Sequence, residues 1–180
     1  MTWIQTNSGN PFNYLHPYDS VITIEDIASG LCALTRFNGH SNWIIRWTVA
    51  QHSLMMADAA DDREIALACL LHDASEAYMS DVARPLKQLL PDYQRIEENV
   101  TQAILAAFGL CFEDEVWAIV KEIDKQACAW EALHLQGPIK GSWVSGRTIT
   151  YNFAYPDHEH PEDVRDEFIE TYDELTTLRK

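Results

Sequence analysis

The sequence predicts an all-α fold. In most segments apolar residues recur at the spacing of three and four that marks one face of a helix. Helix-capping residues stand where these periodic segments begin, and only residues 137–161 combine glycines, prolines and β-forming residues. The chain has 180 residues, enough for one substantial core, and we find no internal repeat or long linker. We therefore expect a single compact helical domain over residues 1–180.

The amino-terminal half should hold three helices after an irregular start. About 20 residues punctuated by glycine and proline open the chain, which favours irregular structure. Thr23 can cap a helix over 24–34, with Asp26 in the capping-box position. A threonine also opens the second helix, expected over 48–60. The third helix, about 63–73, is apolar nearly all round, which predicts a central position in the domain.

The carboxyl-terminal half should add two long helices and a final one. A short helix is expected within 83–90. Proline then opens a long helix over 91–109 that ends at a glycine, and another long helix follows over 113–133. Residues 137–161 are expected to form a loop, with room for a short hairpin. A final amphipathic helix is expected over 161–178.

Charge and hydropathy exclude several classes of partner. The net charge of −15 argues against binding to nucleic acid or to an anionic membrane surface. No apolar run approaches the roughly 20 residues needed to cross a bilayer. The amino terminus lacks the basic start and apolar stretch of a signal peptide. We expect a soluble, cytoplasmic protein in which any phosphate group is held by a few local Arg and Lys side chains.

Four polar residues interrupt apolar helical faces. His72 and Asp73 end the most apolar helix, and burying such groups alone costs free energy. His52 and Asp124 lie on the inward stripes of two other helices. Taken singly, each also fits a satisfied core histidine, a helix cap or an ion-pair partner. Together they predict a mixed nitrogen–oxygen site for a divalent ion such as Co, Mn, Zn, Fe or Mg, with positions left open for water and substrate.

These residues carry a family resemblance. The order His52, His72–Asp73, Asp124 resembles the HD-domain phosphohydrolase superfamily. The run HDASEAYMSDVARPLK that begins at His72, with the pair Arg36–Phe37 and AQHS around His52, is similar to the 5′-deoxynucleotidase branch. It is also similar to the short phage deoxyadenosine triphosphate triphosphohydrolases, and the likeness covers about 24–132.

The resemblance implies a helical HD domain and hydrolysis by attack of a metal-activated water on phosphorus. It further implies a homo-oligomer, either a dimer or a larger ring. Its phage branch implies an enzyme that acts in the host cytoplasm.

The resemblance also implies roles for residues near the ion. Glu76 lies one helical turn after His72 and would serve as general acid and base, supported by Asp81. Arg36 would contact phosphate and Phe37 would border the nucleoside. The alternative for Glu76 and Asp81 is a solvated residue and a helix cap.

Further substrate contacts follow from position. Lys87 follows the acidic motif, and Lys121 stands one helical turn before a predicted ligand, so both are candidate phosphate contacts. Pro85 is expected to border the base. The family has Trp at position 37 and a shorter loop than 38–48, which here contains His40, Trp43 and Trp47. That loop is expected to shape the nucleoside pocket, so the base and the role of His40 stay open.

The sequence thus predicts a metal-dependent phosphohydrolase acting on 2′-deoxynucleotides. Three dispersed cations, Arg36, Lys87 and Lys121, favour a long phosphate tail. We expect a deoxynucleoside triphosphate, with dATP foremost, to be split into deoxynucleoside and triphosphate. A 5′-deoxynucleotidase acting on monophosphates is the first alternative, and a non-catalytic nucleotide- or metal-sensing module is the second. The remaining histidine cluster, residues 158–160, is predicted to be a solvated region before the last helix.

Overall fold

The structure, a computed structural model, confirms the all-α fold. It describes residues 1–41, 46–136, 144, 148–155 and 160–177. In chain order the elements are β1 (Trp3–Gln5), β2 (Pro11–Asn13), η1 (Pro17–Asp19), α1 (Ile24–Ala33), η2 (Arg36–Gly39), α2 (Val49–Asp58), α3 (Arg63–Leu71), α4 (Glu76–Met79), α5 (Arg84–Lys87), α6 (Pro91–Ala107), α7 (Asp114–Leu135) and α8 (Pro161–Thr177).

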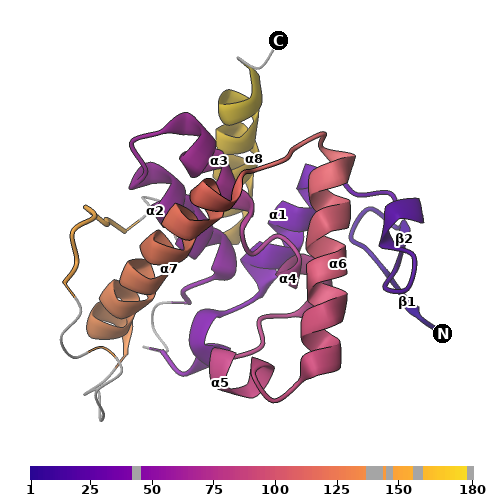
Figure 1. Ribbon diagram of the computed structural model, residues 1–180, viewed down its shortest axis with the longest axis horizontal. Coiled ribbons are helices and arrows are strands. Elements are labelled where there is room, and N and C mark those ends of the chain that lie inside the picture. The colour runs from indigo at the N-terminus through magenta and orange to yellow at the C-terminus, as the bar shows by residue number, and fades with distance from the viewer. Residues whose placement is uncertain (42–45, 137–143, 145–147, 156–159, 178–180) are drawn as a thin grey trace.

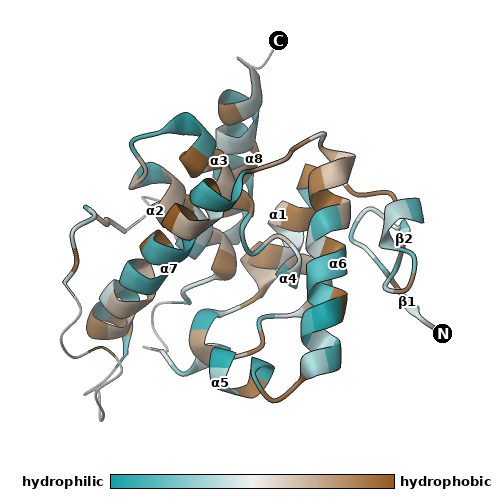
Figure 2. Cartoon of the chain, viewed as in Figure 1, coloured by the Kyte–Doolittle hydropathy of each residue, from teal (hydrophilic) through white to brown (hydrophobic). Residues whose placement is uncertain are grey.

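Helix α3 lies at the centre, as its all-round apolar sequence predicts. It packs against α2, α7 and α8, and α1 packs against α8, α2 and α4. In Figure 1, helix α6 lies on the right and α2 on the left, and the amino-terminal hairpin lies next to α6. Hydrophilic stretches run along the visible faces of α6 and α7 (Figure 2). No helix in the described part of the chain is long and apolar enough to cross a membrane.

The helix starts confirm the expected caps. The Thr23 hydroxyl accepts a hydrogen bond of 3.2 Å from the backbone N–H of Asp26, and α1 follows. At α2 the capping box is complete, because Thr48 and Gln51 each accept a hydrogen bond from the other's backbone N–H. The box expected at Asp26 is only half formed. Its carboxylate instead accepts bonds of 2.8 and 2.7 Å from the backbone and hydroxyl of Ser8.

The irregular start expected for the chain is wrong. Strands β1 and β2 pair antiparallel, with Ile4 opposite Phe12. Phe12 is fully buried and stacks on Tyr78 of α4, with ring centres 4.0 Å apart, and the Tyr14 hydroxyl donates to the Tyr78 carbonyl. Three-residue strands are too short to show an alternating pattern, and the contact that holds them comes from a distant helix. The hairpin therefore fastens the amino terminus to α4.

The loop before the last helix is only partly described. Residues 144 and 148–155 contain no strand, so the optional hairpin is not found there. Residues 137–143, 145–147 and 156–159 lie outside the described residues, and with them most of the 158–160 cluster. His160 is exposed just before α8, which agrees with the solvated position expected for it.

Gly30 allows α1 and α4 to touch. A Cβ atom added to Gly30 would lie 2.8 Å from the Cβ atom of Ala77 and 2.9 Å from that residue's Cα and carbonyl oxygen. Such distances are below normal van der Waals contact, and two of the opposing atoms are backbone. This close approach fixes the position of α4, whose first residue is Glu76.

Gly30→Ala should therefore destabilise the protein although alanine favours helices. Overpacking typically costs about 1–3 kcal/mol, and it should outweigh the roughly 1 kcal/mol gained in helix propensity. Urea denaturation would measure the loss. Ser29→Ala at the preceding position should change the free energy of unfolding by only about 0.5 kcal/mol. A Gly30→Ala protein as stable as wild type would contradict the tight contact.

Candidate metal centre and its cavity

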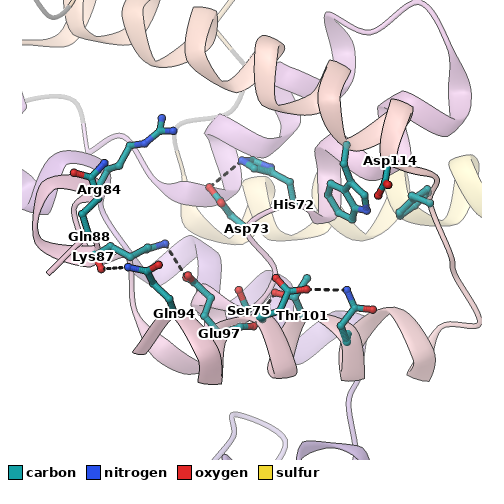
Figure 3. Close-up of a pocket in the computed structure, with 14 residues that line it drawn as sticks. His72, Asp73, Ser75, Arg84, Lys87, Gln88, Gln94, Glu97, Thr101 and Asp114 are labelled. Atoms are coloured by element: carbon teal, nitrogen blue, oxygen red, sulfur yellow. Dashed lines mark hydrogen bonds and ion pairs between the residues drawn. The ribbon is translucent and has the colours of Figure 1, made fainter. Parts of the chain in front are cut away.

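A cavity of about 730 Å³ opens where the α3–α4 turn faces α5, α6 and the start of α7 (Figure 3). That volume lies within the range of about 300–1,000 Å³ typical of small-molecule sites. Most of its lining side chains are polar or charged. They are His72, Asp73, Ser75, Arg84, Lys87, Gln88, Gln94, Glu97, Glu98, Thr101, Gln102, Phe112, Asp114 and Trp117.

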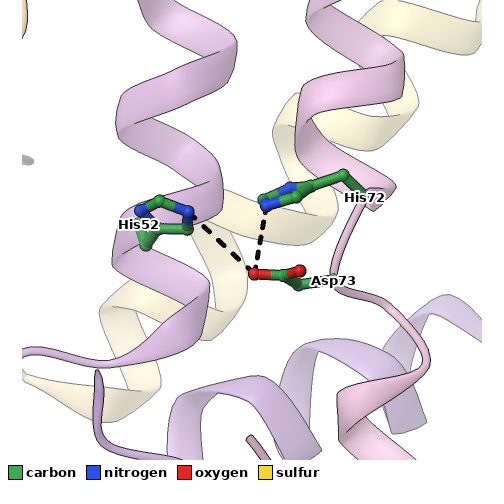
Figure 4. Close-up of side chains that lie close together, drawn as sticks. All are labelled: His52, His72 and Asp73. Atoms are coloured by element: carbon green, nitrogen blue, oxygen red, sulfur yellow. Dashed lines mark ion pairs between the residues drawn. The ribbon is translucent and has the colours of Figure 1, made fainter. Parts of the chain in front are cut away.

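Three of the predicted ligands converge beside this cavity, and two of them, His72 and Asp73, line it (Figure 4). One ligand atom each of His52, His72 and Asp73 lies within 4.8 Å of the other two. Oδ2 of Asp73 is 3.0 Å from Nε2 of His72 and 4.0 Å from Nε2 of His52. Metal–ligand bonds of about 2.0–2.2 Å place neighbouring ligand atoms roughly 3–3.5 Å apart. The three side chains are therefore close enough to hold one metal ion.

The fourth predicted ligand borders the same point. Asp124 projects from α7, which packs against both α2 and α3, and its Oδ1 lies 3.4 Å from Nε2 of His52. The structure thus brings together all four residues that the apolar-face argument singled out.

The histidine tautomers suit metal binding. Nδ1 of His72 lies 2.7 Å from the carbonyl oxygen of Cys69, which can only accept, so this nitrogen donates. Nδ1 of His52 donates in the same way to Oε1 of Glu131, 2.6 Å away. A neutral ring that carries its proton on Nδ1 has its lone pair on Nε2, the atom that would bind a metal, and both Nε2 atoms are buried without a hydrogen-bond partner. A lone pair facing the Asp73 carboxylate repels it unless a cation lies between them, so the residues fit a bound metal.

The surrounding carboxylates favour positive charge at this point. Burial would raise the pKa of Asp124, but His52 and His72 lower it to about 2. Burial would likewise raise the pKa of Asp73, yet the histidines and Arg36 hold it well below its usual range. Burial and Arg36 depress the pKa of His52, but Glu131 and Asp124 outweigh them and raise it to about 9, so without an ion the ring holds a proton that a bound metal would displace. Two ionised carboxylates therefore face the imidazoles.

Glu131 is the functional residue that the sequence analysis missed. It is fully buried on α7, where Oε1 accepts hydrogen bonds from Nδ1 of His52 and, at 2.8 Å, from Nε1 of Trp47. Oε2 accepts from Nη2 and Nε of Arg36 at 3.0 and 3.3 Å. Burial would raise the pKa of Glu131, but Arg36 and His52 lower it to about 2. One signal was available, since Glu131 stands two helical turns after Asp124 on the same inward stripe.

Arg36 reaches the centre from a sharp turn. Phe37 and Asn38 adopt left-handed backbone conformations with φ of 57° and 52°, and the Arg36 N–H bonds to the Trp47 carbonyl at 2.9 Å. Nη1 of Arg36 lies 3.8 Å from Oδ2 of Asp73, and its guanidinium lies 5.6 Å from the Phe37 ring centre. The predicted phosphate contact therefore borders the metal centre, with its aromatic neighbour beside it.

Glu76 is poised to be protonated near the centre. It is buried, its Oε2 has no hydrogen-bond partner, and burial together with Asp73 and Asp81 raises its pKa well above the usual value. Burial also raises the pKa of Asp81. Nζ of Lys87 lies 3.6 Å from Oε1 of Glu76 and 2.7 Å from Oε1 of Glu97. A carboxyl group kept neutral in this way can donate a proton.

The remaining predicted contacts lie elsewhere. Pro85 and Lys121 are exposed and are not among the described residues that line the cavity. His40 is exposed, and its carbonyl accepts a hydrogen bond from Gln136. Trp47 is almost fully buried and bonds to Glu131 instead of lining the cavity. Trp43 lies outside the described residues.

Comparisons with known proteins leave the function open. No protein-family model matches the chain. The chain is similar to the uncharacterized protein YfdR of Escherichia coli (strain K12), with 41% identity over 110 residues, 61% of this chain and 60% of that protein. It is also 34% identical over 115 residues to an uncharacterized protein of Rhodobacter capsulatus, covering 60% of this chain and 59% of that one. The chain thus spans about three fifths of the length of the curated relatives it matches.

A divalent ion should stabilise the protein through this site. An ion present at 100 times its Kd adds about 2.7 kcal/mol of stability, which is roughly 5–10 °C in Tm for a chain of this size. Thermal unfolding with Mn²⁺, Co²⁺, Zn²⁺ or Mg²⁺ against chelator would measure the shift. His72→Ala should abolish it, and His16→Ala, at an exposed histidine, should retain it. Equal shifts in both variants would place ion binding elsewhere.

Glu131→Gln should destabilise the protein and weaken the dependence of its free energy of unfolding on pH below about 4.5. Removing one partner of a buried ion pair costs about 3–5 kcal/mol. The folded pKa of about 2 lies below the ordinary 4.5, so the Glu131 contribution is complete above pH 4.5 and is lost as the pH falls toward 2. Urea denaturation between pH 2 and 7 should show a shallower fall in the variant.

The matched control is Glu115→Gln, at an exposed carboxylate in the first turn of the same helix. It should cost at most about 1 kcal/mol. Equal effects of the two substitutions would contradict the structural role of Glu131.

Proposed function

We propose that the protein is a metal-dependent phosphohydrolase of the HD-domain type that acts on 2′-deoxynucleotides. The preferred substrate is a deoxynucleoside triphosphate, with dATP foremost, split into deoxynucleoside and triphosphate. The bound ion is Co²⁺, Mn²⁺, Zn²⁺ or Mg²⁺, as the mixed imidazole and carboxylate ligands favour. The resemblance extends the proposal to a cytoplasmic homo-oligomer.

One observation carries the proposal: Asp73 of the metal-ligand cluster and Lys87, which contacts Glu76, both line one cavity, and Glu76 is a buried carboxyl group with a raised pKa. Asp73 belongs to the cluster and is also a principal cause of the raised pKa of Glu76. A purely structural metal site has no need of an acid beside it, and its ligands are usually enclosed. Here the cavity leaves two ligands, His72 and Asp73, open to a small molecule.

Each side chain has a definable task. A divalent ion held by His52, His72, Asp73 and Asp124 would polarise a phosphoryl oxygen and lower the pKa of a bound water. Arg36, fixed by Glu131, presents its guanidinium beside Asp73 and can orient a phosphate group.

Glu76 is the proton donor. Its pKa is raised well above the usual value, which favours the protonated form that can donate to the leaving oxygen of the deoxynucleoside. Asp81, a cause of that raised pKa, keeps the proton there by like-charge repulsion.

The 5′-deoxynucleotidase alternative is favoured by a different observation. Glu131 already binds Arg36, Glu97 already binds Lys87, and Lys121 is exposed away from the cavity. Fewer cations are therefore free for a long phosphate tail than the sequence predicted, which suits a single phosphate. A sensing module is disfavoured because it has no use for the protonated Glu76.

The substrate is tested with purified protein, a panel of deoxynucleoside mono- and triphosphates, and each of the four ions. Chromatography that separates phosphate from triphosphate should show triphosphate released from dATP. Release of single phosphate from monophosphates alone would establish the nucleotidase alternative. No release from any nucleotide would contradict the proposed enzyme and favour the sensor.

Glu76→Gln should lower kcat by about 10²–10⁴-fold, the usual contribution of a general acid. The metal-induced rise in Tm should persist, because Glu76 is not one of the ligands. Glu25→Gln, an isosteric change at an exposed position of α1, should leave kcat unchanged. Full activity in Glu76→Gln would show that another group supplies the proton.

A further inference from the structure

The two ends of the cavity differ in chemistry. Arg84, Lys87 and Gln88 lie at one end, Asp114 lies at the other, and His72 and Asp73 lie between them (Figure 3). A substrate that reaches the metal centre therefore has one part beside cations and another part beside a carboxylate.

The carboxylate end holds an aromatic pair. Trp117 lines the cavity, and its ring meets that of Phe112 at 89° with centres 5.6 Å apart. Phe112 is buried and Trp117 is half-buried, so Trp117 offers the larger surface to a ligand. Asp114 stands one helical turn before Trp117, on the same side of α7. An indole ring with a hydrogen-bond acceptor beside it suits a flat, amino-bearing ring.

The distance from the metal centre suits a nucleoside. Trp117 and Asp124 are two turns apart on α7, which corresponds to about 10 Å along the helix axis. A sugar can occupy that interval when a phosphate group is at the ion and a base is at the indole.

Charge sets the orientation. The described ion pairs include no partner for Arg84, whereas Asp114 at the opposite end of the cavity would repel phosphate (Figure 3). Phosphate groups beyond the ion are therefore directed toward Arg84.

We propose that Trp117 stacks on the nucleobase of the substrate, with Asp114 accepting a hydrogen bond from an exocyclic amino group of the base and Arg84 contacting the phosphate tail. This subsite rests on the proposed function, because it takes the substrate to be a deoxynucleotide. It also selects among bases, since adenine, guanine and cytosine carry an exocyclic amino group and thymine does not.

The test separates the two halves of the substrate. Calorimetry on the Mn²⁺-loaded protein measures the affinity for deoxyadenosine, for thymidine and for inorganic tripolyphosphate. Trp117→Leu should weaken deoxyadenosine binding by about tenfold, as expected for loss of a base–aromatic stack, and leave tripolyphosphate binding unchanged. Trp117→Phe should retain most of the affinity. Arg84→Gln should weaken tripolyphosphate binding alone.

Two further variants guard against a merely structural effect. Asp114→Ala, which removes the acceptor, should reduce the preference for deoxyadenosine over thymidine, and the exposure of Asp114 should keep the change in Tm small. Trp3→Ala, at an exposed tryptophan of β1, should change none of the three affinities. Unchanged deoxyadenosine binding in Trp117→Leu, or equal losses for nucleoside and tripolyphosphate, would overturn the subsite.

Different results would contradict the subsite and the proposed function. If the wild type binds both halves as described but hydrolyses no deoxynucleotide, the subsite stands and the enzyme proposal falls. If deoxynucleotides are hydrolysed and Trp117→Leu has a normal KM, the enzyme stands and the subsite is wrong.

Discussion

The structure depends most on one fully buried carboxylate, Glu131. A lone charge in the interior costs several kcal/mol, and this one is stable because three donors surround it. Those donors come from separate parts of the chain: Arg36 from η2, Trp47 from the end of the following loop, and His52 from α2. The same contacts choose the tautomer of a metal ligand and hold the arginine that faces Asp73. The same contacts of Glu131 therefore stabilise the core and fix the geometry of the candidate metal centre.

Carboxylates hold two of the cations near the centre, Arg36 and Lys87, in a chain whose net charge is −15. Glu131 forms an ion pair with Arg36, and Glu97 forms one with Lys87, so both basic side chains are held in one conformation. Each pairing reduces the positive field that an anionic ligand would meet. An ion bound at the histidines would then add the positive charge that attracts phosphate, which is how a strongly acidic protein can be proposed to bind nucleotides.

The helices and the cluster of residues close enough to hold a metal ion could be predicted because their signals are local. Thr23 and Thr48 mark helix starts in the sequence itself, and His52, His72 and Asp124 stand out as polar groups on apolar stripes. Glu131 has the same signature, because it stands on the same inward stripe as Asp124. The partners that keep it buried belong to tertiary structure. Pro85 and Lys121 were expected at the site but do not line the cavity. Helical spacing predicts which face of a helix a residue occupies, but it does not predict which other elements cover that face.

The amino-terminal hairpin has a consequence for the order in which the chain assembles. Its contact with α4 joins Tyr14 to a residue 64 positions later. These strands have no docking surface until α4 has formed and packed on α1. Their contact is a non-local closure of the kind that slows folding. We therefore expect the hairpin to dock only after α1 and α4 have come together.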